Sequence, residues 1–203
     1  MANANKHNKR RTAIKNITPQ PQTTIKCYQI NLQHSRTATD NLMELIEKEG
    51  IDVAFIQEPY TVHNRGAGIS KMYRTFTSTV GRCRTATVYT NNQIDALLIK
   101  ETTDKGTVVV ELIIGSLKFY TANMYLDITR KLEKDIELIN EILQLANTSG
   151  ILIMMDSKSR SKTLHDKLTN GRRKELQAFL ISKQLFIINE KCEMEILKVA
   201  EGL

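Results

Sequence analysis

The order of its short apolar runs constrains this chain more than any other feature. Residues 25–31 (IKCYQIN) and 51–57 (IDVAFIQ) are apolar and of strand length, which is typical of buried strands. Between them, residues 37–49 carry apolar side chains at the helical period of about 3.6, and Ser35 or Thr37 can cap the start of that helix. Strand, helix and strand in close succession predict two adjacent strands covered by a helix.

The rest of the chain adds more strands and two further helices. Successive runs rich in β-branched and aromatic residues predict strands at 85–90, 94–100, 107–113 and 117–125, with loop and a short strand over 60–82. We expect helices over 129–147 and 171–182, and strands over 151–156 and 185–189. Antiparallel runs mixed with helical crossovers predict a layered α/β (α+β) domain with helices outside two sheets.

The basic character of the chain is concentrated at its N-terminus. The net charge is +7, and residues 1–26 carry +6 of it because they contain no acidic residue. The Pro19–Pro21 stretch suits an extended linker. We therefore divide the chain into a basic tail, residues 1–23, and a folded domain, residues 24–203. The tail is either a nuclear-localisation or nucleic-acid-contacting arm, or a solvated leader without a partner.

Composition and cysteine spacing exclude several classes of protein. With 41% hydrophobic and 25% charged residues, the chain suits a globular domain. Its apolar stretches are shorter than the roughly 20 residues that cross a bilayer, and its N-terminus lacks the apolar core of a secretory signal. Cys27, Cys83 and Cys192 lie far apart, which indicates neither a zinc site nor a disulfide framework. We expect an intracellular protein without a membrane partner.

Polar residues follow four of the predicted buried strands. Asn31, Glu58, Tyr125 and Asp156 each stand where an apolar run ends. Because strand ends in layered α/β folds often share one rim, an amide, a phenol and two carboxylates would converge there. Such oxygen donors suit Mg²⁺, which acts as a Lewis acid in phosphodiester attack. The alternative is that strands simply end in polar residues at the surface.

Several motifs in a fixed order carry a resemblance to a known family. They are INLQHS (30–35), IDVAFIQEPY (51–60), ANMYLDI (122–128) and MDSKSRSKTLHDKLTNGRR (155–173), followed by ELQAFL and LFIINE. Together they resemble the apurinic-like endonuclease domain of arthropod non-LTR retrotransposons, a branch of the endonuclease/exonuclease/phosphatase superfamily. The resemblance covers about residues 24–190 and implies a four-layered α/β sandwich.

The resemblance also implies roles for individual residues. Glu58 would be the principal ligand of Mg²⁺ or Mn²⁺, with Asn31 and Asp156 as further ligands. Asn31, Tyr125 and Asp156 would also handle the phosphate and the attacking water. The implied DNA-contacting residues are His34, Ser159, Arg160, Ser161, His165 and Arg172. For His34, a hydrogen bond to a neighbouring loop is an equal alternative.

The implied reaction is the nicking of one DNA strand. Its 3′-hydroxyl product would prime reverse transcription of the element's RNA, so the implied partners are DNA, that RNA and a reverse transcriptase domain. We expect a nuclear monomer. A phosphatase acting on a small phosphoester is another activity of the superfamily, and the DSxSRS…HD…TN segment disfavours it.

The chain departs from the family pattern at two places. Lys158 stands where the family has an asparagine, and a cation there would oppose a divalent ion by several kcal/mol at an effective dielectric of about 20. The family's last strands, with a terminal aspartate–histidine pair, have no counterpart before Leu203. We therefore expect a sandwich that is incomplete at its C-terminus, either as a truncated copy or as a fragment of a longer reading frame. Both departures favour impaired activity, and the alternative function is a non-catalytic DNA-binding relic.

Overall fold

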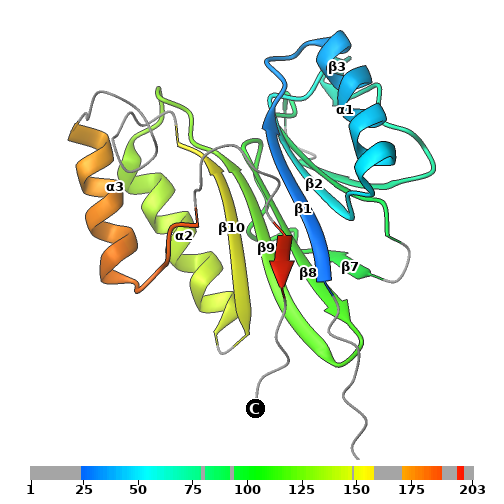
Figure 1. The fold of residues 1–203 in the computed structure, drawn as a ribbon. Coiled ribbons are helices and arrows are strands. Elements are labelled where there is room, and N and C mark those ends of the chain that lie inside the picture. The colour runs from blue at the N-terminus through cyan, green and yellow to red at the C-terminus, as the bar shows by residue number, and fades with distance from the viewer. Residues whose placement is uncertain are drawn as a thin grey trace, which may run out of the picture.

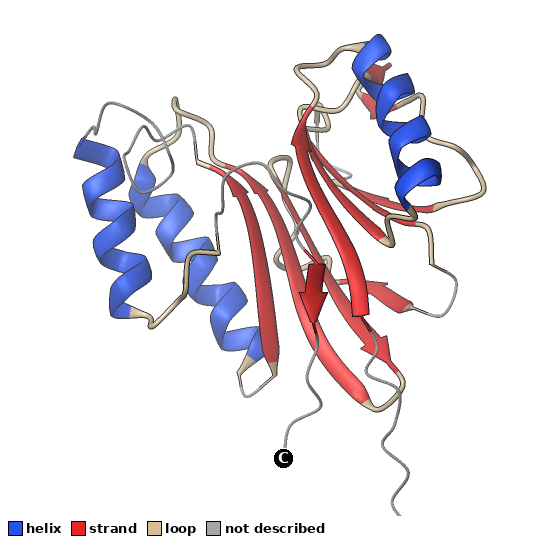
Figure 2. Ribbon diagram, viewed as in Figure 1, coloured by secondary structure: helices blue, strands red, loops and turns tan. Residues whose placement is uncertain are grey.

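Two sheets pack face to face, and helices cover their outer faces (Figure 1). The computed structural model describes residues 24–78, 81–91, 94–147, 149–157, 171–188 and 196–198. Helix α1 (Arg36–Glu49) lies outside one sheet, and helices α2 (Leu132–Ala146) and α3 (Gly171–Ser182) lie outside the other (Figure 2). The predicted layered α/β architecture is confirmed. None of the described helices is long and apolar enough to cross a membrane.

The first sheet has the described strand order β11-β1-β2-β6-β5. Its strands are β1 (Thr24–Asn31), β2 (Val53–Gln57), β5 (Arg74–Thr77), β6 (Thr85–Tyr89) and β11 (Ile196–Lys198). Strands β1 and β2 are parallel, with Asn31 opposite Gln57. A short ribbon, β3 (Thr61–Val62) and β4 (Arg65–Gly66), follows β2.

The second sheet has the described strand order β10-β9-β8-β7. Its strands are β7 (Asp95–Leu98), β8 (Thr107–Ile114), β9 (Leu117–Tyr125) and β10 (Gly150–Asp156). Strands β9 and β10 are parallel, with Tyr125 opposite Asp156. Each sheet therefore contributes one parallel pair, and the predicted site residues lie at the ends of these strands or directly after them.

Helix α1 begins and ends at its capping residues. The Ser35 hydroxyl accepts a hydrogen bond from the Ala38 backbone N–H at 3.2 Å, so Ser35 rather than Thr37 is the N-cap. Gly50 ends the helix in the left-handed conformation at φ 63°, which costs glycine little. Leu42 and Ile46 are buried and pack the helix onto the first sheet.

Strand β2 is apolar from Val53 to Ile56 because both of its faces are buried. Val53 and Phe55 belong to the core between the sheets, whereas Ala54 and Ile56 pack toward helix α1. All four side chains are at most 1% exposed. Successive side chains of a strand point to opposite faces, so a strand between two cores reads as a continuous apolar run.

A buried amide links the two sheets within this apolar core. Asn123 of β9 is fully buried, and its Nδ2 donates to the carbonyl oxygens of Ile56 (3.1 Å) and Ala86 (2.9 Å). Its Oδ1 accepts a hydrogen bond from Nε2 of Gln57 at 2.6 Å. One side chain of the second sheet thus satisfies polar groups on two strands of the first, which fixes the position of the sheets relative to each other.

An ion-pair network joins helix α3 to helix α2 and to the loop that precedes α2. The Asp135 carboxylate, 2% exposed, accepts from Arg172 Nη2 at 2.7 Å and lies 3.2 Å from Arg130 Nε. Arg130 also pairs with Asp104 at 2.6 Å. Arg172 Nη1 donates to the backbone oxygen of Arg130 at 2.8 Å. Burial raises the pKa of Asp135, and the charges of the two arginines oppose that shift.

The C-terminal part of the chain differs from the sequence prediction. The strand predicted at 185–189 is wrong over its described residues, because Leu185–Ile188 form no strand. Phe186 is 93% and Ile188 54% exposed, so much of this apolar segment faces solvent. Strand β11, which pairs antiparallel with β1, was not predicted. The predicted tail, residues 1–23, lies outside the described residues.

Replacing Asn123 with leucine tests the link between the sheets. Asn123→Leu keeps the side-chain size but leaves the Gln57 amide without its partner and removes one hydrogen bond from each of two backbone carbonyls, so we expect a loss of about 3 kcal/mol in the free energy of unfolding. Urea unfolding measures it. The control Asn41→Leu, on the exposed face of α1, should change stability by less than about 0.5 kcal/mol. A similar value for both variants would contradict the proposed role of Asn123.

Neutralising Asp135 tests the ion-pair network. Asp135→Asn leaves Arg130 and Arg172 without their shared charge partner, so we expect a loss of about 2–3 kcal/mol. The matched control is Glu137→Gln, which removes the surface pair between Glu137 and Lys134, whose side chains are 58% and 62% exposed. That change should cost less than about 0.5 kcal/mol. Equal unfolding midpoints for the two variants would show that the network adds no stability.

Candidate functional site

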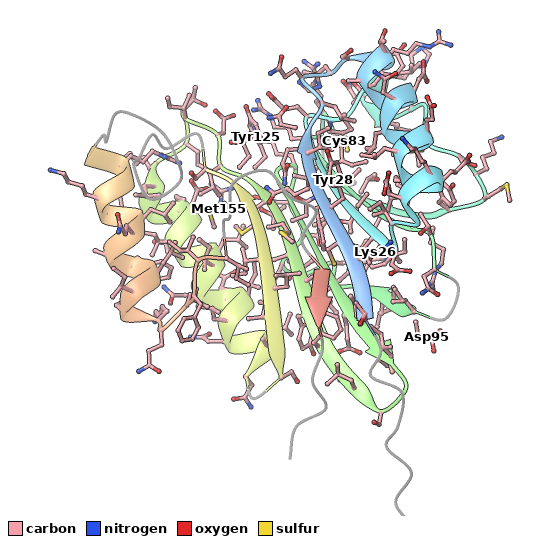
Figure 3. The ribbon with its side chains drawn as sticks, in the orientation of Figure 1. Lys26, Tyr28, Cys83, Asp95, Tyr125 and Met155 are labelled. Carbon is pink, nitrogen blue, oxygen red and sulfur yellow. The ribbon has the colours of Figure 1, made fainter. Side chains whose placement is uncertain are left out.

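The four predicted site residues stand at the carboxyl ends of four strands. Asn31 ends β1 and Glu58 follows β2 directly, while Tyr125 ends β9 and Asp156 ends β10. Figure 3 labels Tyr125 at the upper rim of the second sheet, beside the first sheet. The parallel pairing of β1 with β2 and of β9 with β10 places the members of each pair at the same level. The ordering of strands therefore brings these residues to one rim.

A direct hydrogen bond joins the two sheets at this rim. Asn31 Nδ2 donates to Asp156 Oδ2 at 2.6 Å, across 125 positions of sequence. Asn31 Oδ1 accepts from the backbone N–H of Gln33 at 2.8 Å. Because the amide is held at both ends, its donor faces the carboxylate of Asp156. The predicted convergence of these two strand ends is present in the structure, and their roles in metal and phosphate binding stay predictions.

The backbone at Glu58 lies in the left-handed region, at φ 46°. For a residue with a side chain this conformation costs about 1 kcal/mol or more. Two hydrogen bonds maintain it: the Glu58 N–H donates to the Arg84 oxygen at 2.8 Å, and the Glu58 oxygen accepts from the His34 N–H at 2.8 Å. His34 and Gln33 also have positive φ, at 59° and 49°. Such local strain is typical of positions where geometry serves a function.

His34 lies beside Glu58 and is bonded to a neighbouring loop. Its Nδ1 is 3.0 Å from the Pro59 backbone oxygen, so Nδ1 carries the proton and donates. Its Nε2 is 3.9 Å from Glu58 Oε1, close enough for an ion pair when the ring is protonated. The loop hydrogen bond that the sequence left as an alternative is present. A DNA contact by this half-exposed ring stays a prediction.

Tyr125 is held by its backbone and covered by a cation. Its N–H donates to the Gly106 oxygen at 2.7 Å, and a Cβ at Gly106 would lie 2.9 Å from the Tyr125 oxygen, so only glycine fits there. The Arg84 guanidinium lies 5.3 Å from the centre of the Tyr125 ring. Arg84 Nη1 also pairs with Asp127 Oδ2 at 2.8 Å. Sequence reasoning missed both Arg84 and Asp127.

The donor set at the rim fits a hard divalent cation. It consists of oxygens from two carboxylates, Glu58 and Asp156, and from the Asn31 amide. Mg²⁺ takes one or two protein carboxylates and keeps several waters for exchange with substrate oxygens. The Glu58 side chain is 18% exposed, so solvent and ions can reach it. Over the described ranges, no three side chains among His, Cys, Asp and Glu are grouped to hold an ion by themselves.

Of the remaining predicted site residues, only Arg172 is among the residues that the structure describes. Lys158, Ser159, Arg160, Ser161 and His165 lie outside the described residues. Arg172 is described, and its guanidinium is engaged by Asp135 and by backbone oxygens of the loop before α2. A DNA contact by Arg172 stays a prediction.

Comparisons with known proteins give similarity at the level of structure. No protein-family model and no curated protein matches the chain. The endonuclease domain of TRAS1, a telomere-specific non-LTR retrotransposon, superposes with a TM-score of 0.73 at 22% identity, covering 82% of this chain and 74% of that one. The AP endonuclease LMAP from Leishmania major gives a TM-score of 0.58 at 14% identity, with 80% and 67% coverage. The human Nocturnin catalytic domain gives 0.51 at 13% identity, with 68% and 65% coverage.

Identities this low establish the fold alone. The mixed sheets, the outer helices and these structural neighbours agree with the fold expected from the sequence motifs. The expected incompleteness at the C-terminus stays a prediction. The chain therefore has the α/β sandwich fold of the endonuclease/exonuclease/phosphatase type.

Proposed function

We propose that this chain is a metal-dependent DNA endonuclease domain of the non-LTR retrotransposon type, which nicks target DNA to prime reverse transcription. The observation that carries the proposal is the 2.6 Å hydrogen bond between Asn31 and Asp156, because it joins strand ends of both sheets into one site. The similarity in fold to a retrotransposon endonuclease domain and to an AP endonuclease supports DNA as the substrate.

Each residue at the rim has its own role in the proposed hydrolysis of the phosphodiester. Glu58, Asn31 and Asp156 would hold Mg²⁺ or Mn²⁺, which stabilises charge on the phosphate. The Asp156 carboxylate, oriented by the Asn31 amide, accepts the proton of the attacking water. The Tyr125 phenol donates a hydrogen bond to a phosphate oxygen and keeps its proton. The new bond joins water oxygen to phosphorus, the bond to the 3′ oxygen breaks, and that oxygen takes up a proton from solvent water.

The nicked product fits the role of a primer. A 3′-hydroxyl is the group that a reverse transcriptase extends, so the further partners in this proposal are the element's RNA and a reverse transcriptase domain. The site would then act in the nucleus, and the chain would act as a monomer. The basic tail, residues 1–23, would contact nucleic acid or direct nuclear import.

The second candidate function is DNA binding without cleavage, and Lys158 is the observation that favours it. Lys158 follows Asp156 by two positions in the sequence, and in this proposal its ammonium pairs with a carboxylate of the site. A cation that pairs with Glu58 or Asp156 substitutes for part of the metal's charge and weakens metal binding. With the lysine in place of the metal, the site keeps its charge balance but does not cleave DNA.

Replacing Lys158 separates the two candidates. We expect Lys158→Asn to raise Mg²⁺-dependent nicking of supercoiled plasmid at least about tenfold, which corresponds to about 1.4 kcal/mol in the activation free energy. Nicking is measured as conversion of supercoiled to open-circular DNA. If the unchanged chain nicks as fast as Lys158→Asn, impairment by Lys158 is wrong. If neither nicks while both bind DNA, the non-catalytic reading holds.

Replacing Glu58 tests whether the rim is the catalytic site. In the Lys158→Asn background, Glu58→Gln removes one ligand charge and should lower the nicking rate about a hundredfold or more. Glu137→Gln, an exposed change on α2, is the matched control and should nick at the rate of the Lys158→Asn chain. Undiminished nicking after Glu58→Gln would place the catalytic centre elsewhere.

A further inference from the structure

Arg84 lies between the candidate metal ligand and the candidate phosphate-binding phenol. Its backbone oxygen accepts the Glu58 N–H at 2.8 Å, and its guanidinium lies over the Tyr125 ring at 5.3 Å. It directly precedes strand β6, next to Cys83, which Figure 3 labels near the same rim as Tyr125. A cation at this point is beside the place where a phosphate would bind.

Asp127 fixes the direction of the Arg84 guanidinium. Its Oδ2 lies 2.8 Å from Arg84 Nη1, and its Oδ1 accepts from the Thr129 N–H at 2.9 Å and the Thr129 hydroxyl at 2.8 Å. The Thr129 N–H is the main cause that lowers the pKa of Asp127, and the charges of Arg84 and Lys105 act in the same direction. Asp127 is therefore an anion at neutral pH and can hold the arginine.

The loop that carries Asp127 is itself held at both ends. The Leu126 N–H donates to the Asp156 oxygen at 2.9 Å, which attaches the loop to the site strand β10. Arg172 donates to the backbone oxygens of Asp127 (3.4 Å) and Arg130 (2.8 Å). The orientation of Arg84 is thus part of the folded structure, so binding a ligand there requires little further ordering of the side chain.

The exposure and the chemistry of Arg84 suit an anionic ligand. Its side chain is 30% exposed, so it can be reached from solvent. A guanidinium has five N–H donors in a fixed plane that matches a phosphate group, and the pair with Asp127 engages Nη1. The Lys105 backbone oxygen accepts the Arg84 N–H at 3.1 Å, and the positive charge of Lys105 acts on Asp127 together with that of Arg84.

We infer that Arg84 is a substrate-binding residue, which contacts a backbone phosphate of the DNA and positions it between Glu58 and Tyr125, with Asp127 as its orienting partner. The inference rests on the proposed function and adds a residue to it. The competing account is that Arg84 only supports the backbone of Glu58 and covers the Tyr125 ring.

The test compares duplex DNA binding by the full chain over a series of salt concentrations, with Ca²⁺ as the added ion. We expect Arg84→Gln to weaken binding about tenfold at low salt and to reduce the slope of log affinity against log salt by about one. Arg84→Lys should keep the slope, because it keeps the charge, but should nick more slowly in the Lys158→Asn background, because an ammonium lacks the planar fork. The control is Lys48→Gln, in the last turn of α1, at the opposite end of the helix from Ser35. It should change neither the salt slope nor the nicking rate.

Three outcomes would overturn the inference. If the unchanged chain binds DNA and Arg84→Gln leaves its salt slope unaltered, Arg84 makes no phosphate contact, while the proposed function stands. If Arg84→Gln lowers Mn²⁺ affinity as much as Glu58→Gln does, Arg84 acts through Glu58 rather than on DNA. If the unchanged chain does not bind DNA, the proposed function fails, and the inference fails with it.

Discussion

The position of the two sheets relative to each other depends on buried polar contacts between them, above all those of the Asn123 amide. Apolar side chains fill most of the space between the sheets, and apolar packing alone defines register weakly because it has no direction. A second buried hydrogen bond, between the hydroxyls of Tyr89 and Thr121 at 3.1 Å, also joins the sheets. The amide bonds to the carbonyls of Ile56 and Ala86 and to the Gln57 side chain, so β9 has one favoured position against β2 and β6. This is a constraint on geometry as much as on stability.

The candidate site follows from that constraint by chain geometry. Glu58 comes directly after Gln57, and Tyr125 lies two residues beyond Asn123, on the same rim. The hydrogen bond from Asn31 to Asp156 then joins the end of β1 to the end of β10. The hydrogen bonds of these amides thus fix the relative position of the two sheets. The residues at the strand ends are positioned with the sheets. A site assembled in this way lies on rigid elements rather than on loops, which suits chemistry that needs fixed distances.

Strain and charge at the rim are balanced by the surrounding chain. Positive φ at Glu58 is maintained by backbone hydrogen bonds to His34 and Arg84. The cation of Arg84 is held by Asp127, whose loop is fastened by Arg172. In the structure the Arg172 guanidinium donates to the loop that carries Asp127, and Asp127 in turn pairs with Arg84. The DNA contact expected for Arg172 stays a prediction.

Sequence patterns predicted those parts of the molecule that depend on local order. The alternation of apolar runs and helical periods gave the layers, and the polar residues at strand ends gave Asn31, Glu58, Tyr125 and Asp156. Arg84 could not be found in this way, because only the pairing of β2 with β6 brings it beside Glu58. The apolar segment Leu185–Ile188 has the composition of a strand, but a strand also requires a pairing partner, and composition does not reveal one. Strand β11 is the converse case, since its pairing with β1 is what defines it.

We propose that the rim of Asn31, Glu58 and Asp156 binds one divalent cation. The most direct measurement is a Mn²⁺ titration followed by electron paramagnetic resonance, on the Lys158→Asn chain so that no added cation opposes binding. We expect a single tightly bound Mn²⁺ ion, whose affinity falls at least about tenfold after Glu58→Gln and is unchanged after Glu137→Gln. Equal Mn²⁺ affinity in all three chains would contradict it.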